Sequence, residues 1–172
     1  MFNVYVDYPD EEEELEIVKR TTADAVRQVT ATLTADDIVQ LGQIVRRVPV
    51  AEHIIRYALQ FTRLTRKEKV AVPDFVRNYV SWGAGPRASQ YLVLGAKARA
   101  ILHGRFHATC EDIRAVALPV LRHRIMTNFN AEAEGIRPDE IIRRLCQLIP
   151  EQAHGQSDGD KLPQLFGSEH AR

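Results

Sequence analysis

The chain has 172 residues, of which 45% are hydrophobic and 27% are charged, and its 23 basic and 23 acidic residues give a formal net charge of zero. This length suits one domain, or one domain with a tail, and can bury a core without disulfides or a structural metal. The neutral balance argues against a nucleic-acid binder that acts through bulk positive charge and against an acidic solvating chain. Cys110 and Cys146 form no CxxC pair, so a small secreted disulfide framework is excluded. No apolar run has the length of a membrane span and the N-terminus does not look like a signal peptide, so we expect a reduced, soluble, cytoplasmic protein.

Charge is unevenly distributed along the chain. Residues 1–14 carry six acidic side chains and no basic one, whereas residues 85–127 carry seven basic and two acidic side chains, a net charge of +5. Solvated helix faces are one explanation. A head-to-tail contact, or an anionic ligand on the basic half, is the other.

The first predicted elements are a strand and a helix. Residues 2–8 are rich in aromatic and β-branched types and favour a strand, which Pro9 ends. Asp10 is a suitable N-cap for a helix over about residues 11–20, whose acidic first turn suits the helix dipole.

Two further helices are predicted before residue 66. Thr34 is a suitable N-cap for the first, with Asp37 in the position where a capping box usually has Glu or Gln. Pro49 ends this helix and is expected in the first turn of the next, over about residues 50–65. The first helix has an apolar stripe at helical spacing, made of Ile38, Leu41, Ile44, Val45 and Val48.

The middle of the chain predicts a central helix. Residues 73–82 are interpreted as a short helix, and residues 83–86 as a turn rich in glycine. Pro86 then starts a helix over about residues 86–103, which Gly104 ends. Because this helix is apolar around much of its circumference, we expect it at the centre of the fold.

The C-terminal part predicts two more helices and a short strand. Thr109 is a suitable N-cap for a helix over residues 110–123, which Pro119 is expected to kink or restart. Residues 124–129 favour a strand, and a helix runs from Pro138 to about Leu148. The chain is thus predicted to be mainly α, a helical bundle with two short strands.

Residues 83–89 form the best candidate site by pattern. The chain has no GxxxxGK[ST] phosphate loop. However, free backbone N–H groups at a helix start, close backbone approach at Gly85 and the guanidinium of Arg87 together can bind an anion. The alternative is an ordinary Gly-Pro helix start with a surface arginine.

Three other patterns carry little chemistry. His103, His107 and Cys110 have spacing that suits zinc, but no fourth ligand is evident and His103 falls at a helix end, where it can satisfy carbonyl groups. We therefore predict no metal site. Ser89 lies in no nucleophile elbow, and the acidic run of residues 11–14 has no catalytic partner.

Several stretches together resemble MoxR-type AAA+ ATPases. Residues 4–9, followed by the acidic run of residues 11–15, resemble the junction between the ATPase core and the lid of that family. The Gly-Ala-Gly-Pro-Arg-Ala of residues 83–88 resembles its sensor II segment. Residues 120–125 and 128–135 resemble its C-terminal stretch.

This resemblance implies a domain organisation. Family members have an αβα nucleotide-binding core with Walker motifs, sensor I and an arginine finger, followed by a helical lid. Residues 1–9 resemble the end of that core and its hinge, residues 10–150 the lid, and residues 151–172 are predicted to be a flexible tail. All core elements would lie upstream of Met1, so the resemblance implies that this chain alone does not hydrolyse ATP.

The resemblance also implies roles for particular residues. Arg87 corresponds to the sensor II arginine, which holds the γ-phosphate of ATP in the full-length protein. Gly85 and Pro86 flank it, and Tyr8 and Pro9 would lie near the hinge and the adenine. ATP with Mg²⁺ would bind the full-length protein, with none held tightly by this chain.

The partners implied by the resemblance are an upstream AAA+ core, a homo-oligomeric ring of six subunits, and proteins with a von Willebrand factor A domain. Neither a membrane nor a nucleic acid is expected as a partner. The alternative function is a stand-alone helical module that binds a protein or nucleic acid. A Walker A motif encoded upstream of this chain would favour the lid of an ATPase over the stand-alone module.

Overall fold

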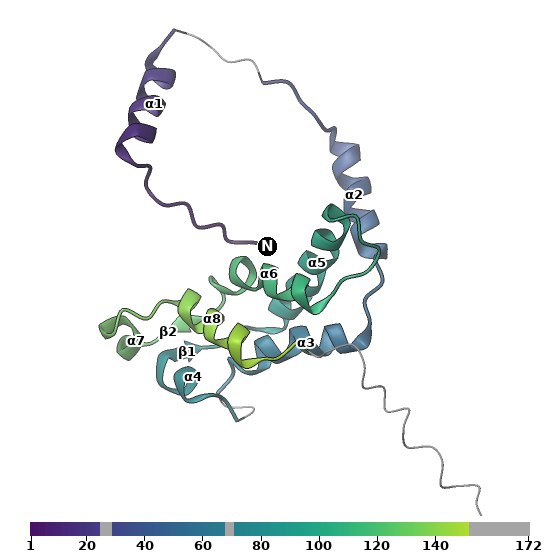
Figure 1. Ribbon diagram of the computed structural model, residues 1–172, viewed down its shortest axis with the longest axis vertical. Helices are drawn as coiled ribbons and strands as arrows, with labels where there is room; N and C mark the ends of the chain where they lie inside the picture. Colours follow the sequence, from purple (N-terminus) through teal and green to yellow (C-terminus); the bar gives the residue numbers. More distant parts are fainter. Residues whose placement is uncertain (25–28, 68–70, 152–172) are drawn as a thin grey trace, which may run out of the picture.

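The computed structural model of the chain describes residues 1–24, 29–67 and 71–151, which form eight α-helices and one two-stranded antiparallel sheet (Figure 1). The mainly α prediction is confirmed. None of these helices is long and apolar enough to cross a membrane. Beyond Glu151, the predicted tail lies outside the described residues. The elements are α1 (Glu11–Thr22), α2 (Ala35–Arg47), α3 (Glu52–Arg63), α4 (Asp74–Tyr79), β1 (Val80–Trp82), α5 (Pro86–Leu102), α6 (Cys110–Leu121), β2 (Met126–Thr127), α7 (Phe129–Ala133) and α8 (Pro138–Leu148).

Three helices begin at capping boxes. The side chains of Asp10, Thr34 and Thr109 each accept a hydrogen bond from the backbone N–H of the residue three positions later. The acidic side chain of that later residue accepts a hydrogen bond from the backbone N–H of the N-cap residue. These local contacts satisfy two of the backbone N–H groups that a helix start leaves open. The predicted starts of α1, α2 and α6 are therefore confirmed.

The core lies where α5 packs between its neighbours. α5 contacts α2, α3 and α6, and α6 also packs on α8, which confirms the predicted central place of α5. Pro119 stays inside α6. Pro49 follows the C-cap of α2 at Val48, as predicted, but its predicted place in the first turn of α3 was wrong, because α3 has its N-cap at Ala51. The largest fully buried side chains are Tyr57, Phe61, Ile54, Leu92, Ile113, Leu121, Ile141, Ile142, Leu145, Val76, Val80 and Val120.

The small sheet departs from the prediction of one helix over residues 73–82. The helix ends at Tyr79, and Val80 and Trp82 pair with Thr127 and Met126 across an irregular register. The hydroxyl of Ser81 donates to the carbonyl groups of Met126 and Thr127, both at 3.0 Å. β2 lies inside the predicted strand, whereas the short helix α7 was not predicted.

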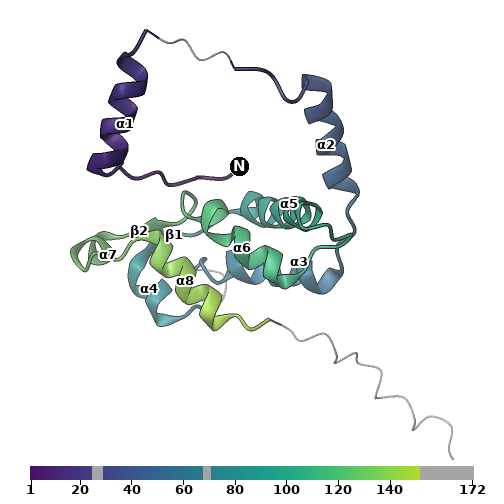
Figure 2. The ribbon, with the colours of Figure 1, turned by 45° about the horizontal axis from the view of Figure 1, so that its top comes forward.

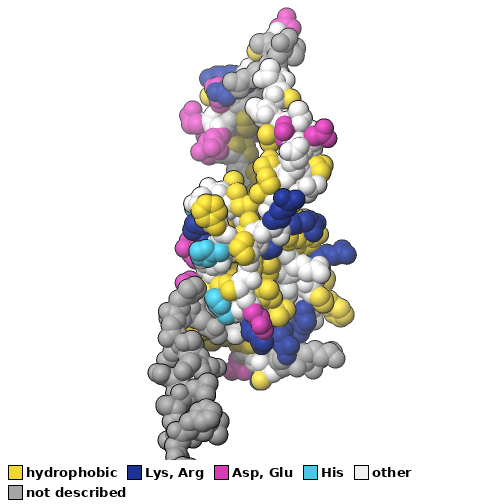
Figure 3. All heavy atoms as spheres, turned by 90° about the vertical axis from the view of Figure 1, so that its right-hand side faces the viewer, with side chains coloured by type: hydrophobic (Ala, Val, Ile, Leu, Met, Phe, Trp, Pro, Cys, Tyr) yellow, Lys and Arg dark blue, Asp and Glu magenta, His cyan; other side chains and the backbone are white. Residues whose placement is uncertain are grey.

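Helix α1 stands away from this core, whereas residues 1–3 and α2 contact it (Figure 1). Residues 2–8 are extended but form no strand, so that prediction was wrong; within the described residues no strand pairs with them. α1 has no buried residue. The predicted stripe of α2 is helical, yet Ile38 is 62% exposed and Leu41 and Ile44 are about half exposed. Figure 3 shows such hydrophobic side chains on the face that carries α2.

Candidate functional site: the start of α5

The glycine-rich turn before α5 is fixed against the end of α3. A Cβ on Gly83 would overlap the backbone carbonyl of Thr65, so only glycine fits there. The N–H of Ala84 donates to Thr65 Oγ1 at 2.9 Å, and its carbonyl accepts from Arg66 Nε at 2.8 Å. Ala84 is fully buried. Both backbone groups of Ala84 are therefore held by the residues that directly follow α3.

A second buried contact fixes the first turn of α5. The hydroxyl groups of Thr62 on α3 and Ser89 on α5 are hydrogen-bonded at 2.8 Å, and both residues are buried. Thr65 Oγ1 also donates to the carbonyl of Thr62 at 2.7 Å. Because these bonds are shielded from water, they restrict how the start of α5 can move relative to α3.

The start of α5 presents an open helix terminus and a cation. Gly85 is the N-cap and offers no side-chain cap, and Pro86 occupies the first helical position. Arg87 follows and is exposed. Pro86 has no N–H, and the N–H of Ala88 donates to the carbonyl of Gly85 at 3.0 Å. The helix dipole and the guanidinium of Arg87 therefore carry the attraction for an anion in this position.

A second arginine lies near Arg87. The guanidinium carbon of Arg124 is 5.0 Å from the ring centroid of Tyr91, one turn after Arg87 on α5. Burial and the charge of Arg87 lower the pKa of Arg124, although Tyr91 opposes this shift. Burial, Arg124 and the N-terminal ammonium likewise lower the pKa of His123. The local field is thus positive, which would strengthen attraction of an anion.

The predicted site residues fall into two groups. Gly85, Pro86 and Arg87 are adjacent at the start of α5. Tyr8 and Pro9 lie instead at the start of α1, where Tyr8 is 95% exposed and Pro9 lines a shallow pocket with side chains of α1. Their predicted place beside the adenine stays a prediction.

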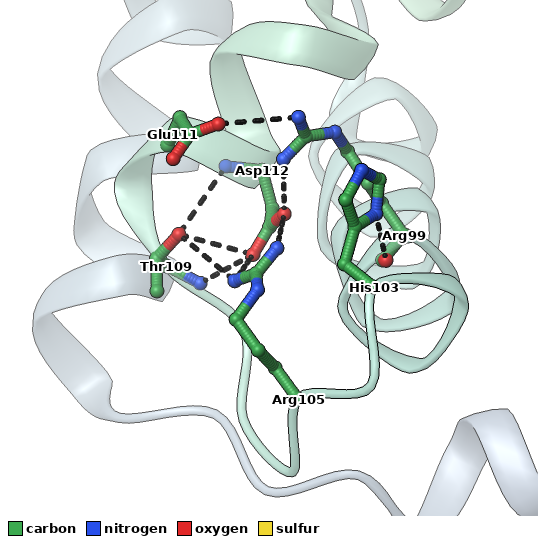
Figure 4. A network of polar contacts seen from close by, with 6 residues as sticks. All are labelled: Arg99, His103, Arg105, Thr109, Glu111 and Asp112. Carbon is green, nitrogen blue, oxygen red and sulfur yellow. Dashed lines mark hydrogen bonds and ion pairs between the residues drawn. The ribbon is translucent and has the colours of Figure 1, made fainter.

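The zinc-like spacing has a different explanation. His103 Nδ1 is hydrogen-bonded to the carbonyl of Arg99 at 2.9 Å, in the last turn of α5 (Figure 4). His107 is exposed and Cys110 is buried. Within the described ranges, no three His, Cys, Asp or Glu side chains gather as a metal site would require.

Sequence reasoning missed the residues that support the site. Thr62 and Thr65 were interpreted only as part of a helix and no role was predicted for Arg66, since their contacts with the turn and with α5 depend on tertiary packing. No role at this site was predicted for Arg124. The basic stretch of residues 85–127 was the available signal, but the contact of Arg124 with Tyr91 could not be predicted from it.

Comparisons with known proteins agree with this architecture. Residues 75–145 match the family model described as the AAA lid domain. Over 164 residues the chain is 30% identical to the chaperone MoxR1 of Mycobacterium tuberculosis (strain ATCC 25618 / H37Rv), covering 90% of this chain and 43% of that protein. A 73-residue stretch is 38% identical to protein MoxR of Methylorubrum extorquens, covering 41% of this chain and 21% of that protein.

A solved structure shares the fold. It is the crystal structure of a candidate ATPase from Cytophaga hutchinsonii ATCC 33406, with a TM-score of 0.76 and 30% identity over 87% of this chain and 46% of that chain. The chain therefore spans less than half the length of these relatives. The predicted resemblance to the MoxR-type lid is confirmed.

Proposed function

Because the chain carries the AAA lid domain of the MoxR-like ATPase family, we propose that it acts as the lid of a chaperone-type ATPase and senses the γ-phosphate of ATP through Arg87. The observation that supports this role most directly is the exposed Arg87 on a helix start that is held by buried hydrogen bonds, one between Ser89 in its first turn and Thr62 and one from Ala84 in the preceding turn to Thr65.

The chemistry proposed for the chain is electrostatic. The guanidinium of Arg87 would bind phosphate oxygens and stabilise the negative charge that develops during hydrolysis. Because the site is pre-positioned, little ordering would be needed when the phosphate binds. When the phosphate leaves, this attraction is lost and α5 is released. Since α5 packs on α2, α3 and α6, its displacement would move the helical body as a whole.

The remaining features of the parent protein are part of the same proposal. Gly85 and Pro86 shape the phosphate side of the site, and Tyr8 and Pro9 contribute from the hinge. An AAA+ core in the longer protein supplies the bound ATP and Mg²⁺. By family resemblance, that protein forms a six-membered ring in the cytoplasm and works with proteins that contain a von Willebrand factor A domain.

The test is ATP turnover by a longer protein that joins this chain to its ATPase core. Arg87→Ala should lower kcat about thirtyfold or more, while the thermal melting curve stays in place. Arg56→Ala is the matched control, since Arg56 is also exposed, with 73% of its side chain accessible, and lies on α3. If both variants turn over ATP equally, Arg87 does not sense phosphate.

One observation favours the alternative of a stand-alone interaction module. α1 and α2 carry apolar side chains that are about half exposed, among them Leu15, Ile38 and Leu41. Such surfaces suit contact with another protein domain. Measured binding of the chain to an ATPase core supplied as a separate protein would support the lid, whereas binding only to unrelated partners would support the module.

A further inference from the structure

The first three residues of the chain are docked at the junction of α5 and α6, in contrast to the residues that follow them. The N–H of Asn3 donates to the carbonyl of Pro119 at 2.7 Å. Arg122 donates to the carbonyl of Asn3 at 3.4 Å, and Arg124 donates to that of Met1 at 3.2 Å. In both ribbon views the N-terminus lies beside α6 (Figures 1 and 2).

These bonds use backbone groups that the end of α6 leaves open. The last four carbonyl groups of a helix have no partner within it. At the end of α6, the carbonyl of Pro119 accepts from Asn3, and that of Val120 accepts from the guanidinium of Arg124. The backbone N–H groups of Arg122 and Arg124 satisfy the carbonyls of Leu118 and Leu121. The N-terminal segment thus completes the C-terminal cap of α6.

A glycine in α5 makes room for the side chain of Phe2. Gly95 is buried in the middle of α5, where glycine is otherwise unfavourable. A Cβ at this position would lie 2.9 Å from Phe2 Cζ, 3.1 Å from Phe2 Cε1 and 3.3 Å from Val116 Cγ2. The phenyl ring therefore rests against bare backbone between α5 and α6, and Phe2 is 45% exposed.

The two arginines are themselves held in place by other elements. Arg122 forms two hydrogen bonds with the carboxylate of Asp139 on α8, at 3.1 and 2.8 Å. Arg124 lies over the ring of Tyr91 on α5. Because each guanidinium is fixed before it meets the N-terminal carbonyls, little side-chain freedom is lost when the segment docks.

We propose that Gly95, Arg122 and Arg124 form an anchoring site that binds residues 1–3 in extended form, so that this segment moves with α5 and α6 as one body. The flexible connection to α1 then lies in residues 4–9. There Val4, Val6 and Tyr8 are 75%, 83% and 95% exposed. The anchoring site does not depend on the proposed role of Arg87 as a phosphate sensor, because it is formed only by contacts between residues of this chain and needs no bound ATP.

Amide hydrogen exchange of the full chain, followed by NMR, tests the site. The Asn3 amide should exchange at least about tenfold more slowly than an unstructured amide, whereas the Val4 and Val6 amides should not be protected. Gly95→Ala should lower the protection of Asn3 severalfold, because its Cβ would lie 2.9 Å from Phe2 Cζ and the ring would have to shift. Gly42→Ala is the matched control, since a Cβ at Gly42, also within a helix, meets no atom within 4 Å.

A background comparison separates docking from general stability. In the Phe2→Ala chain, Gly95→Ala should give a more positive change in melting temperature than in the chain with Phe2 intact. Alanine is the better helix former, and once the ring is removed only Val116 Cγ2, at 3.3 Å, crowds its Cβ. Equal shifts in both backgrounds, or an unprotected Asn3 amide in the unaltered chain, would overturn the anchoring site.

Discussion

Replacing Asp112 by asparagine tests how far the α5–α6 junction depends on one buried charge. The side chain of Asp112 is fully buried and accepts hydrogen bonds from Arg99 at 2.6 Å and from Arg105 at 2.5 and 2.7 Å (Figure 4). It also caps α6 through the N–H of Thr109 at 2.9 Å. Asparagine keeps the shape, but it removes the charge and turns one acceptor into a donor that faces the arginines.

The expected cost follows from the burial of this network. Removing one partner of a buried ion pair costs about 3–5 kcal/mol. The side chains of Arg99 and Arg105 are 24% and 31% exposed, so water can solvate them in part after the change. We therefore expect Asp112→Asn to lower the free energy of unfolding by about 2–4 kcal/mol.

The effect depends on pH in a defined direction. Burial by itself would raise the pKa of Asp112, but hydrogen bonds from Arg105, Arg99 and Thr109 outweigh it and hold the pKa well below 3.8. A carboxylate with a lowered pKa in the folded state stabilises fully above its unfolded pKa, and this contribution is lost as the pH falls below that value. Stability of the unaltered chain should therefore drop more steeply below about pH 4 than that of Asp112→Asn.

Urea-induced unfolding, followed by circular dichroism and by the fluorescence of Trp82, measures both effects. Asp37→Asn is the matched control, because Asp37 closes the same kind of capping box with Thr34 but is only partly buried, and no arginine bond to it is found in the described chain. The control should shift the unfolding midpoint much less. Equal losses in the two variants would refute the reasoning, since capping alone would then account for the role of Asp112.

Three further predictions concern the turn, the hydroxyl pair and ATP. Gly83→Ala should lower the free energy of unfolding by about 2–3 kcal/mol, because its Cβ overlaps a backbone carbonyl; Gly85→Ala, which meets no atom within 4 Å, should change it by a few tenths. Chemical denaturation compares the two. Thr62→Val and Ser89→Ala should each cost about 1 kcal/mol, and the double variant little more than either, in a double-mutant cycle. The purified chain should not hydrolyse ATP, since it has no phosphate loop; turnover that persists in Arg87→Ala through stringent purification would contradict this.

Features that depend on neighbours in the sequence were predictable. The caps at Thr34 and Thr109 and the start of α5 at Pro86 were recognised because each signal lies within a few residues of the turn it controls. The strand of residues 80–82 was missed for the opposite reason. Its partner strand lies about 45 residues further along the chain, and the sequence of residues 73–82 is compatible with one continuous helix. The same dependence on a partner explains why residues 2–8 are extended without forming a strand.

At the candidate site too, the local pattern was predictable and the tertiary contacts were not. Arg87 and the glycines around it were visible in the sequence, because a Gly-Pro-Arg helix start is a local pattern. What fixes that pattern was not visible, since Thr65 meets Gly83 only when α3 packs beside α5. Gly95 gives the clearest case. In sequence it is an unfavourable residue inside a helix, and its close contacts with Phe2, more than ninety residues earlier, and with Val116 on α6 supply a reason for it. A glycine that breaks a local rule inside a buried helix therefore marks a position where another segment must come close.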